Sequence, residues 1–296
     1  MSEKPVLFSG AATALVTPFK KGKLDIPALR RLLAFQLEGE ISAVVVLGTT
    51  GEASTLTDSE RDTVIEEAAA ALKGKCPVIV GVGSNDTRRA VAFAKRAAAL
   101  GADGLLAVTP YYNKGTDSGI VQHYLDIADA TDLPLLLYNV PSRTGVDLTL
   151  SQYDRLAHHP HIVGTKEAKG EIGRLTDLVA RFPNGEMCVY TGNDSEFLPA
   201  LSVGASGVIS VLSNLFPADM MNAYRLFSAG NHTAAALILR HLHKTARLLF
   251  AETNPAPVKA ALSILGFIEN ELRLPMAAVT DALYEKIAEE LSTLGA

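Results

Sequence analysis

Short hydrophobic runs alternate with longer segments of helical periodicity along most of the chain. The runs begin near Ala11, Ala43, Val78, Gly104, Leu135, Ile162, Met187 and Gly207. Runs such as Val44–Val46 and Val78–Val80 are apolar throughout, which is typical of parallel strands covered on both faces. Eight strand–helix units in succession predict an α/β fold, a (β/α)8 TIM barrel.

Signals at the helix ends support this division. Thr57 and Glu60 have the spacing of a capping box, Asp25 precedes a first-turn proline, and Gly101 follows a helical run. A doubly wound open sheet is the competing fold. It usually carries a glycine-rich dinucleotide-binding loop after its first strand, and residues 15–19 contain no glycine. The count of eight units also favours the closed barrel.

The pattern changes after the eighth unit, where the strand signals end. Residues 231–252, 257–265 and about 277–294 show helical periodicity only. We therefore expect a barrel with the active site in residues 1–229 and a C-terminal helical subdomain in residues 230–296.

The composition argues against large charged partners. The 296 residues are 48% hydrophobic and carry a net charge of −5, which disfavours nucleic acid or an anionic membrane as the partner. Cys76 and Cys188 are far apart and match no metal or redox motif, so we expect reduced thiols. We expect the histidines at 158, 159 and 161 to be surface residues and expect no metal site. The absence of a transmembrane-length or signal-peptide pattern predicts a soluble, cytoplasmic protein.

The chemistry of such a barrel is expected at the carboxyl ends of its strands. The sixth strand ends on Lys166, and burial there would favour the free amine that a Schiff-base nucleophile needs. The alternative is that Lys166 ends its strand in solvent or pairs with Glu167. Other strand ends deliver further polar residues to the same face, and their convergence favours a functional lysine. They are Thr49, Thr50, Tyr111, Tyr112, Tyr138 and Arg143.

Three segments resemble the signatures of a known family. They are residues 48–52 (GTTGE), 138–145 (YNVPSRTG) and 164–167 (GTKE). They are similar to the dihydrodipicolinate synthase (4-hydroxy-tetrahydrodipicolinate synthase) family of pyruvate-dependent class I aldolases. The resemblance implies condensation of pyruvate with L-aspartate 4-semialdehyde through a covalent imine, without a cofactor or a metal. It also implies a homo-oligomer, which we expect to be a tetramer.

The same resemblance implies a role for each matching residue. Lys166 would form the imine, and Tyr138 would carry protons in a relay with Thr50 and with Tyr112 of a neighbouring subunit. Arg143 would hold the semialdehyde carboxylate with two parallel hydrogen bonds. The substrate-binding positions are Thr49, Thr50, Arg143, Gly192 and Ile209.

Feedback inhibition by L-lysine is a feature of regulated relatives. By the resemblance, Ser54, Asn85 and Tyr111 match their inhibitor site, which we note as a possible allosteric site. Arg89, however, stands where those relatives carry an acid, and a guanidinium repels an ammonium group. We therefore expect weak or absent inhibition by L-lysine.

Two other functions remain open at this point. One is a sister aldolase that acts on a sugar acid, either N-acetylneuraminate or a 2-keto-3-deoxy acid. It would share Lys166 and Tyr138, and Arg143 argues against it. The other is a non-catalytic paralogue that binds a keto acid, and the presence of every matched catalytic residue argues against that.

Overall fold

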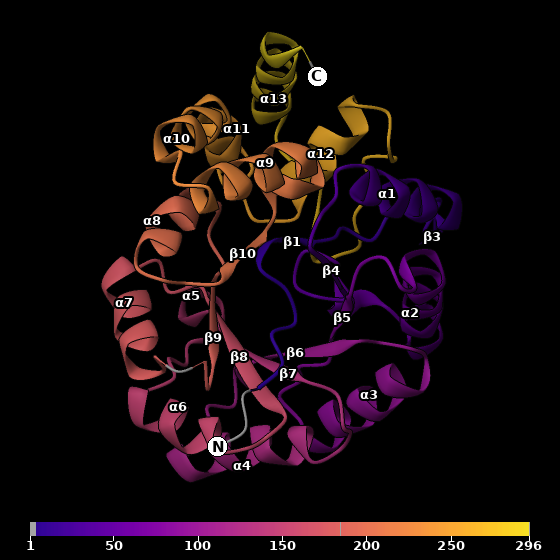
Figure 1. Cartoon of the computed structure of the whole chain (residues 1–296). Helices are drawn as coiled ribbons and strands as arrows, with labels where there is room; N and C mark the ends of the chain where they lie inside the picture. The colour runs from indigo at the N-terminus through magenta and orange to yellow at the C-terminus, as the bar shows by residue number, and fades with distance from the viewer. Residues whose placement is uncertain (1–3, 184, 296) are drawn as a thin grey trace.

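A closed barrel of eight parallel strands forms the centre of the computed structural model, which describes residues 4–183 and 185–295 (Figure 1). In order round the barrel the strands are β1 (Gly10–Ala14), β10 (Gly207–Ser210), β9 (Cys188–Thr191), β8 (Ile162–Glu167), β7 (Leu135–Asn139), β6 (Gly104–Val108), β5 (Val78–Gly81) and β4 (Ala43–Val46). The predicted TIM barrel is confirmed, and each strand begins within one residue of its predicted start.

Helices surround the barrel. They are α1 (Ile26–Glu38), α2 (Asp58–Leu72), α3 (Thr87–Ala99), α4 (Asp117–Ala128), α5 (Pro141–Thr144), α6 (Leu150–Ala157), α7 (Ile172–Arg181), α8 (Phe197–Ser202) and α9 (Pro217–Ser228). The predicted capping box is present, because the Thr57 hydroxyl accepts the N–H of Glu60 while the Glu60 carboxylate accepts the N–H of Thr57. At the start of α1, the Asp25 carboxylate accepts the N–H of Ala28.

Smaller elements join these units. A two-stranded hairpin follows β1, and one-turn helices follow three of the barrel strands. These elements are β2 (Phe19–Lys20), β3 (Lys23–Leu24), η1 (Ala53–Thr55), η2 (Asp194–Glu196) and η3 (Leu212–Asn214). The hairpin was not predicted from the sequence, because strands of two residues show no hydrophobic periodicity.

Strand side chains alternate between two hydrophobic clusters. In β7, Leu135 and Leu137 belong to an outer cluster between strands and helices, whereas Leu136 and Tyr138 belong to an inner cluster enclosed by the barrel. This alternation follows from the two-residue period of a strand. It decides which side chains reach the interior of the barrel.

A β-bulge in β8 shifts that alternation by one residue. The register against β7 slips near the start of β8, which leaves Val163 as an extra residue that also faces the inner cluster. After the bulge Lys166 lies beside the inward-facing Tyr138. In a regular strand, Lys166 would face outwards like Ile162, because the two are four positions apart. The bulge therefore turns Lys166 into the barrel.

The C-terminal helices gather at one end of the molecule, far from the N-terminus in Figure 1. They are α10 (His232–His241), α11 (His243–Leu248), α12 (Ala256–Ile264) and α13 (Asp281–Leu294). The range 231–252, predicted to be helical, contains two helices divided at Leu242; α10 packs on α9 and α11 packs on α13. The last helix begins at Asp281 rather than near 277, since the Thr280 hydroxyl caps it.

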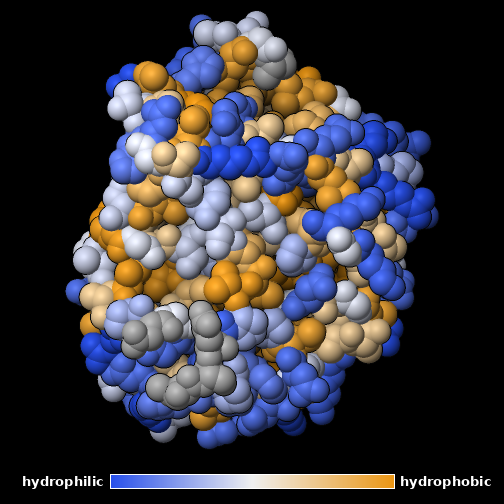
Figure 2. All heavy atoms as spheres, viewed as in Figure 1, coloured by the Kyte–Doolittle hydropathy of each residue, from blue (hydrophilic) through white to orange (hydrophobic). Residues whose placement is uncertain are grey.

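The C-terminal helices share the outer cluster with the barrel. Leu15 and Leu29 of the barrel region lie in the same cluster as Leu262 and Leu283. The proposed boundary between residues 229 and 230 stays a prediction. No helix in the part of the chain that the structure describes has the length and apolar character that a membrane span requires. On the face shown in Figure 2, hydrophobic residues form patches near the middle and along the left edge, and hydrophilic residues dominate the right and lower edges.

Arg273 ties the segment between α12 and α13 to the barrel. Its guanidinium donates to the Glu60 carboxylate at 2.5 and 2.8 Å, and to the carbonyl oxygens of Gly22 and Thr55. The hydrogen bonds from Arg273 are the main reason why the pKa of Glu60 falls from 4.5 to about 2. The ion pair therefore favours the folded state wherever Glu60 is ionised in the unfolded chain.

Replacing Glu60 by Gln should make the free energy of unfolding less dependent on pH in the acid range. A carboxyl whose pKa is lower in the folded state stabilises the fold fully above its unfolded pKa of 4.5 and loses this contribution as the pH falls towards about 2. Chemical denaturation at several pH values should show wild type more stable than Glu60→Gln at pH values above 4.5, with a narrowing gap in more acidic buffer. A gap that stays constant into the acid range would contradict the assigned pKa shift.

Candidate active site

Lys166 is buried at the end of β8 and lies against Tyr138. Lys166 is only 6% exposed, and its Nζ is 4.4 Å from the centroid of the Tyr138 ring. The two residues are register partners on neighbouring strands, which fixes this contact through the backbone. An ammonium above a phenol ring gains cation–π attraction when it is shielded from water. The alternative of a solvent-exposed Lys166 is therefore wrong.

Glu167 faces the opposite side of β8 and does not pair with Lys166. Its carboxylate accepts hydrogen bonds from Asn139 Nδ2 at 3.0 Å and from the Lys169 backbone at 2.9 Å, and it forms an ion pair with Arg174. Burial raises the pKa of Glu167, and these donors oppose that shift. Glu167 thus fixes the outer face of β8 directly behind the lysine.

Gly192 lies next to the lysine, and Ile209 faces the interior of the barrel. A Cβ on Gly192 would lie 2.9 Å from Lys166 Cε and 2.6 Å from the Cβ of Ala168. Only a glycine leaves room there for the lysine side chain. Ile209 is fully buried in the inner cluster that also contains Tyr138.

The threonine loop after β4 is held by Asn254, a residue that precedes α12. Asn254 Nδ2 donates to the buried Thr50 hydroxyl at 2.9 Å. The backbone carbonyl of Asn254 accepts a hydrogen bond from the Arg143 guanidinium at 3.3 Å. One residue thereby links two predicted substrate-binding residues. The sequence offered no signal for Asn254, since it lies in an irregular segment far from both along the chain.

A buried ion pair with α12 also holds the loop after β4. Lys259 of α12 donates to the Glu52 carboxylate, and both side chains are excluded from water. The second Glu52 oxygen accepts the Arg273 N–H at 3.1 Å. Glu52 has φ of 50°, a left-handed conformation that is costly for a residue other than glycine. Burial lowers the pKa of Lys259 to about 8, and the Glu52 carboxylate opposes this shift.

A cavity of about 610 Å³ opens beside these residues. Thr49, Tyr138 and Arg143 are part of its lining, and so are the possible allosteric residues Ser54, Asn85 and Tyr111. Tyr112 is not part of this lining within the single chain; the residue is 88% exposed and has φ of 73°.

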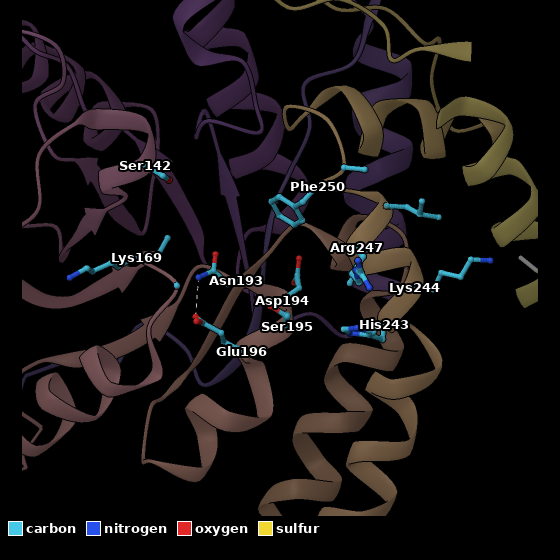
Figure 3. A pocket seen from close by; sticks show the side chains of 15 residues that line it. Ser142, Lys169, Asn193, Asp194, Ser195, Glu196, His243, Lys244, Arg247 and Phe250 are labelled. Carbon is cyan, nitrogen blue, oxygen red and sulfur yellow. Dashed lines mark hydrogen bonds between the residues drawn. The ribbon is translucent and has the colours of Figure 1, made fainter. Parts of the chain in front are cut away.

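A second cleft, of about 1010 Å³, separates the loops after β8 and β9 from α11 (Figure 3). Asp194 lies on its barrel side, opposite His243 and Arg247 of the helix. Asp194, three residues beyond the end of β9, was not among the predicted site residues. Its Oδ2 accepts the backbone N–H groups of Val211 and Leu212 at 3.1 and 3.0 Å. Burial raises the pKa of Asp194, and the charge of Lys166 opposes this shift.

The arrangement suits covalent chemistry on a carbonyl. A buried primary amine can attack a keto group, and the neighbouring Tyr138 phenol and Thr50 hydroxyl can accept and donate protons. The Arg143 guanidinium, on the exposed α5, offers hydrogen bonds to a carboxylate at the rim of the cavity.

Comparison with known proteins gives consistent results. Residues 7–294 match the model of the dihydrodipicolinate synthetase family. A 4-hydroxy-tetrahydrodipicolinate synthase from Alkaliphilus oremlandii is 45% identical and is aligned over 96% of this chain and 98% of its own length. One from Thermotoga neapolitana is 44% identical over 98% and 99%. The crystal structure of dihydrodipicolinate synthase from Thermotoga maritima is 42% identical, covers 98% of this chain and 99% of its own, and superimposes with a TM-score of 0.95.

Removing one partner of the buried ion pair should destabilise the fold strongly. Lys259→Met leaves the Glu52 carboxylate buried without its counter-charge, which costs about 3–5 kcal/mol in unfolding free energy. The double variant Lys259→Met with Glu52→Gln should recover a large part of that loss, because no charge is then left unpaired. Denaturant unfolding measures both. A single variant as stable as wild type would contradict the role of the pair.

Proposed function

Because this chain belongs to the dihydrodipicolinate synthetase family, we propose that it condenses pyruvate with L-aspartate 4-semialdehyde to give 4-hydroxy-tetrahydrodipicolinate. The product is an intermediate of lysine and diaminopimelate biosynthesis, and the enzyme is a lyase. The observation that carries the proposal is the buried amine of Lys166, held beside the Tyr138 phenol at the carboxyl end of the barrel.

The proposed reaction begins on Lys166. Its Nζ attacks the keto carbon of pyruvate, and the keto oxygen leaves as water to give an imine. The protonated imine withdraws electrons, so a methyl proton leaves and an enamine forms. The enamine carbon then bonds to the aldehyde carbon of the second substrate; the C=O π bond opens, the aldehyde oxygen takes up a proton to become the hydroxyl of the product, and the imine on Lys166 is formed again. The amino group of that substrate finally attacks the imine carbon, which closes the ring and releases Lys166. The lysine itself provides the electron sink, so the proposed reaction requires no separate cofactor.

Proton transfer is proposed for Tyr138 together with Thr50. Both are buried, and Asn254 holds the Thr50 hydroxyl in place. The third member of the relay would be Tyr112 from a neighbouring subunit. Its exposure in the single chain fits a residue that contributes to the site of another copy. Together with the family resemblance, this leads us to propose a homotetramer.

Substrate binding is proposed for the threonine loop, Arg143, and the backbone at Gly192 and Ile209. The hydroxyls of Thr49 and Thr50 and the amides of their loop suit the carboxylate of pyruvate. Arg143 would bind the semialdehyde carboxylate, which distinguishes the proposed reaction from that of a sugar acid aldolase. We propose a cytoplasmic location, which agrees with the free, buried thiols of Cys76 and Cys188.

Trapping with borohydride should label Lys166 alone. Pyruvate followed by sodium borohydride reduces the imine to a stable amine, and peptide mass analysis should find the added group on Lys166. Lys166→Ala should lose both the label and activity with pyruvate and L-aspartate 4-semialdehyde. Lys169→Ala is the matched control, because this lysine lies nearby but pairs with Asp147 and Glu171. An unlabelled wild-type protein would refute the proposed mechanism.

Arg143→Lys should impair the second substrate more than the first. Lysine keeps the charge but loses the paired hydrogen bonds, so kcat/KM for L-aspartate 4-semialdehyde should fall by about tenfold to a hundredfold while the KM for pyruvate changes little. Arg155→Lys, an exposed arginine paired with Asp117, is the control. If Arg143→Lys had no effect, or if wild type preferred a sugar acid aldehyde in the same assay, the choice of substrate would be wrong.

A further inference from the structure

A second pair of residues lies at the ends of β7 and β8 and has no part in the proposed reaction. Asn139 and Glu167 are register partners, directly after the pair formed by Tyr138 and Lys166. Because successive strand residues face opposite sides, Tyr138 and Lys166 point into the barrel while Asn139 and Glu167 lie on its outer side. Both outer residues are at most 2% exposed, so their polar atoms need partners within the protein.

The Glu167 carboxylate accepts hydrogen bonds from four segments of the chain. Asn139 Nδ2 of β7 donates to it at 3.0 Å, and the backbone N–H of Lys169, in the loop after β8, donates at 2.9 Å. Tyr153 of α6 donates at 3.3 Å, and Arg174 of α7 donates at 3.4 Å. A buried carboxylate is tolerated only where such donors replace water. The four segments are therefore held together at one point.

Asn139 and Arg174 extend this connection to the loop after β7. The Asn139 side chain donates to the Asp147 carboxylate at 2.8 Å and accepts the backbone N–H of Leu148 at 3.1 Å. Arg174 donates to the backbone carbonyl of Leu148. The far end of the loop is thus fastened to β8 through the same two side chains that bind Glu167.

The loop that is fastened in this way carries Arg143. It consists of residues 140–148 and contains α5. The Thr144 hydroxyl lies within hydrogen-bond distance of the carbonyl oxygens of Val140 and Val146, at 3.2 and 2.9 Å, which closes the loop on itself. Because both ends are fastened and the middle is closed, the backbone at Arg143 has a defined position relative to β8.

We propose that Asn139, Glu167 and Arg174 are positioning residues that set the separation between Lys166 and Arg143, and through it the chain length of the second substrate. This inference rests on the proposed function, in which the imine forms on Lys166 and Arg143 binds the semialdehyde carboxylate. The distance from the aldehyde carbon to the carboxylate must then match the distance between the two protein groups. Pyruvate depends on Lys166 and the threonine loop, so its binding should be little affected.

Hydrogen exchange tests the fastening without any turnover. Glu167→Gln keeps the shape of the side chain but presents an NH2 group where the carboxylate accepts hydrogen bonds, so at least one donor loses its acceptor. Amides within residues 140–148 should then exchange at least about tenfold faster, while those of residues 58–72 keep their rates. Glu171→Gln, an exposed acid paired with Lys169 in the loop after β8, is the matched control and should exchange like wild type.

Competition between two aldehyde acids tests the spacing. The acid 4-oxobutanoate keeps the distance between aldehyde and carboxylate of L-aspartate 4-semialdehyde, and 5-oxopentanoate is one methylene longer. As competitors of the semialdehyde, wild type should favour the shorter acid by at least about tenfold. In Glu167→Gln this preference should fall by at least about threefold, while the KM for pyruvate changes by less than about twofold. Partial unfolding lowers the active fraction equally for both acids, so a merely structural role would leave the ratio unchanged.

Arg174→Lys provides a second variant in case Glu167→Gln does not fold. It keeps a positive charge beside Glu167, but a single ammonium replaces the fork that also reaches the Leu148 carbonyl, so the preference should fall here too. Equal competition by the two acids in wild type, an unchanged ratio in the folded variants, or unchanged exchange of residues 140–148 would overturn the proposal. An unlabelled Lys166 after pyruvate and borohydride would instead refute the proposed function, and the exchange rates would still decide whether these residues fasten the loop.

Discussion

The buried ion pair between Lys259 and Glu52 joins segments 207 positions apart, and the geometry of the candidate active site depends on it. Neither charge is tolerable alone where water is excluded, so α12 and the loop after β4 must meet in one arrangement. Asn254, which precedes α12, then reaches Thr50 and Arg143. The C-terminal segment therefore contacts the site through Asn254, while Lys259 and the Arg273 N–H hold the Glu52 carboxylate.

The cost of desolvating charge also explains why the carboxylates of Glu167 and Asp194 accept several hydrogen bonds at this end of the barrel. Glu167 is surrounded by donors on the outer face of β8, and Asp194 accepts two backbone N–H groups beside the cleft of Figure 3. Lys166 has the face of an aromatic ring instead of a carboxylate beside it. No carboxylate of the described residues lies within ion-pair distance of its nitrogen, which leaves the nitrogen sterically open to a carbonyl carbon, as a covalent mechanism requires.

Much of the fold could be predicted from the sequence because its signals are local. Continuous apolar runs located the strands, and Thr57 with Glu60 located the start of a helix. Lys166 and Tyr138 were singled out because both lie near the carboxyl ends of strands. Long-range contacts left no such signal, so Asn254 and Lys259 were missed. The helix break at Leu242 depends on which helices pack together, and the role proposed for Tyr112 depends on a second copy of the chain. Neither can be derived from the periodicity of one segment.

The bulge at Val163 has a consequence for how residues of β8 can be exchanged with those of other strands. Before the extra residue the even-numbered position Ile162 faces outwards, whereas after it the even-numbered position Lys166 faces inwards. A designer who grafts Lys166 onto a regular barrel strand by counting from the strand's first residue would place the amine among the outer helices. The lysine must therefore be transferred together with the β-bulge at Val163, and its position must be counted from the carboxyl end of the strand.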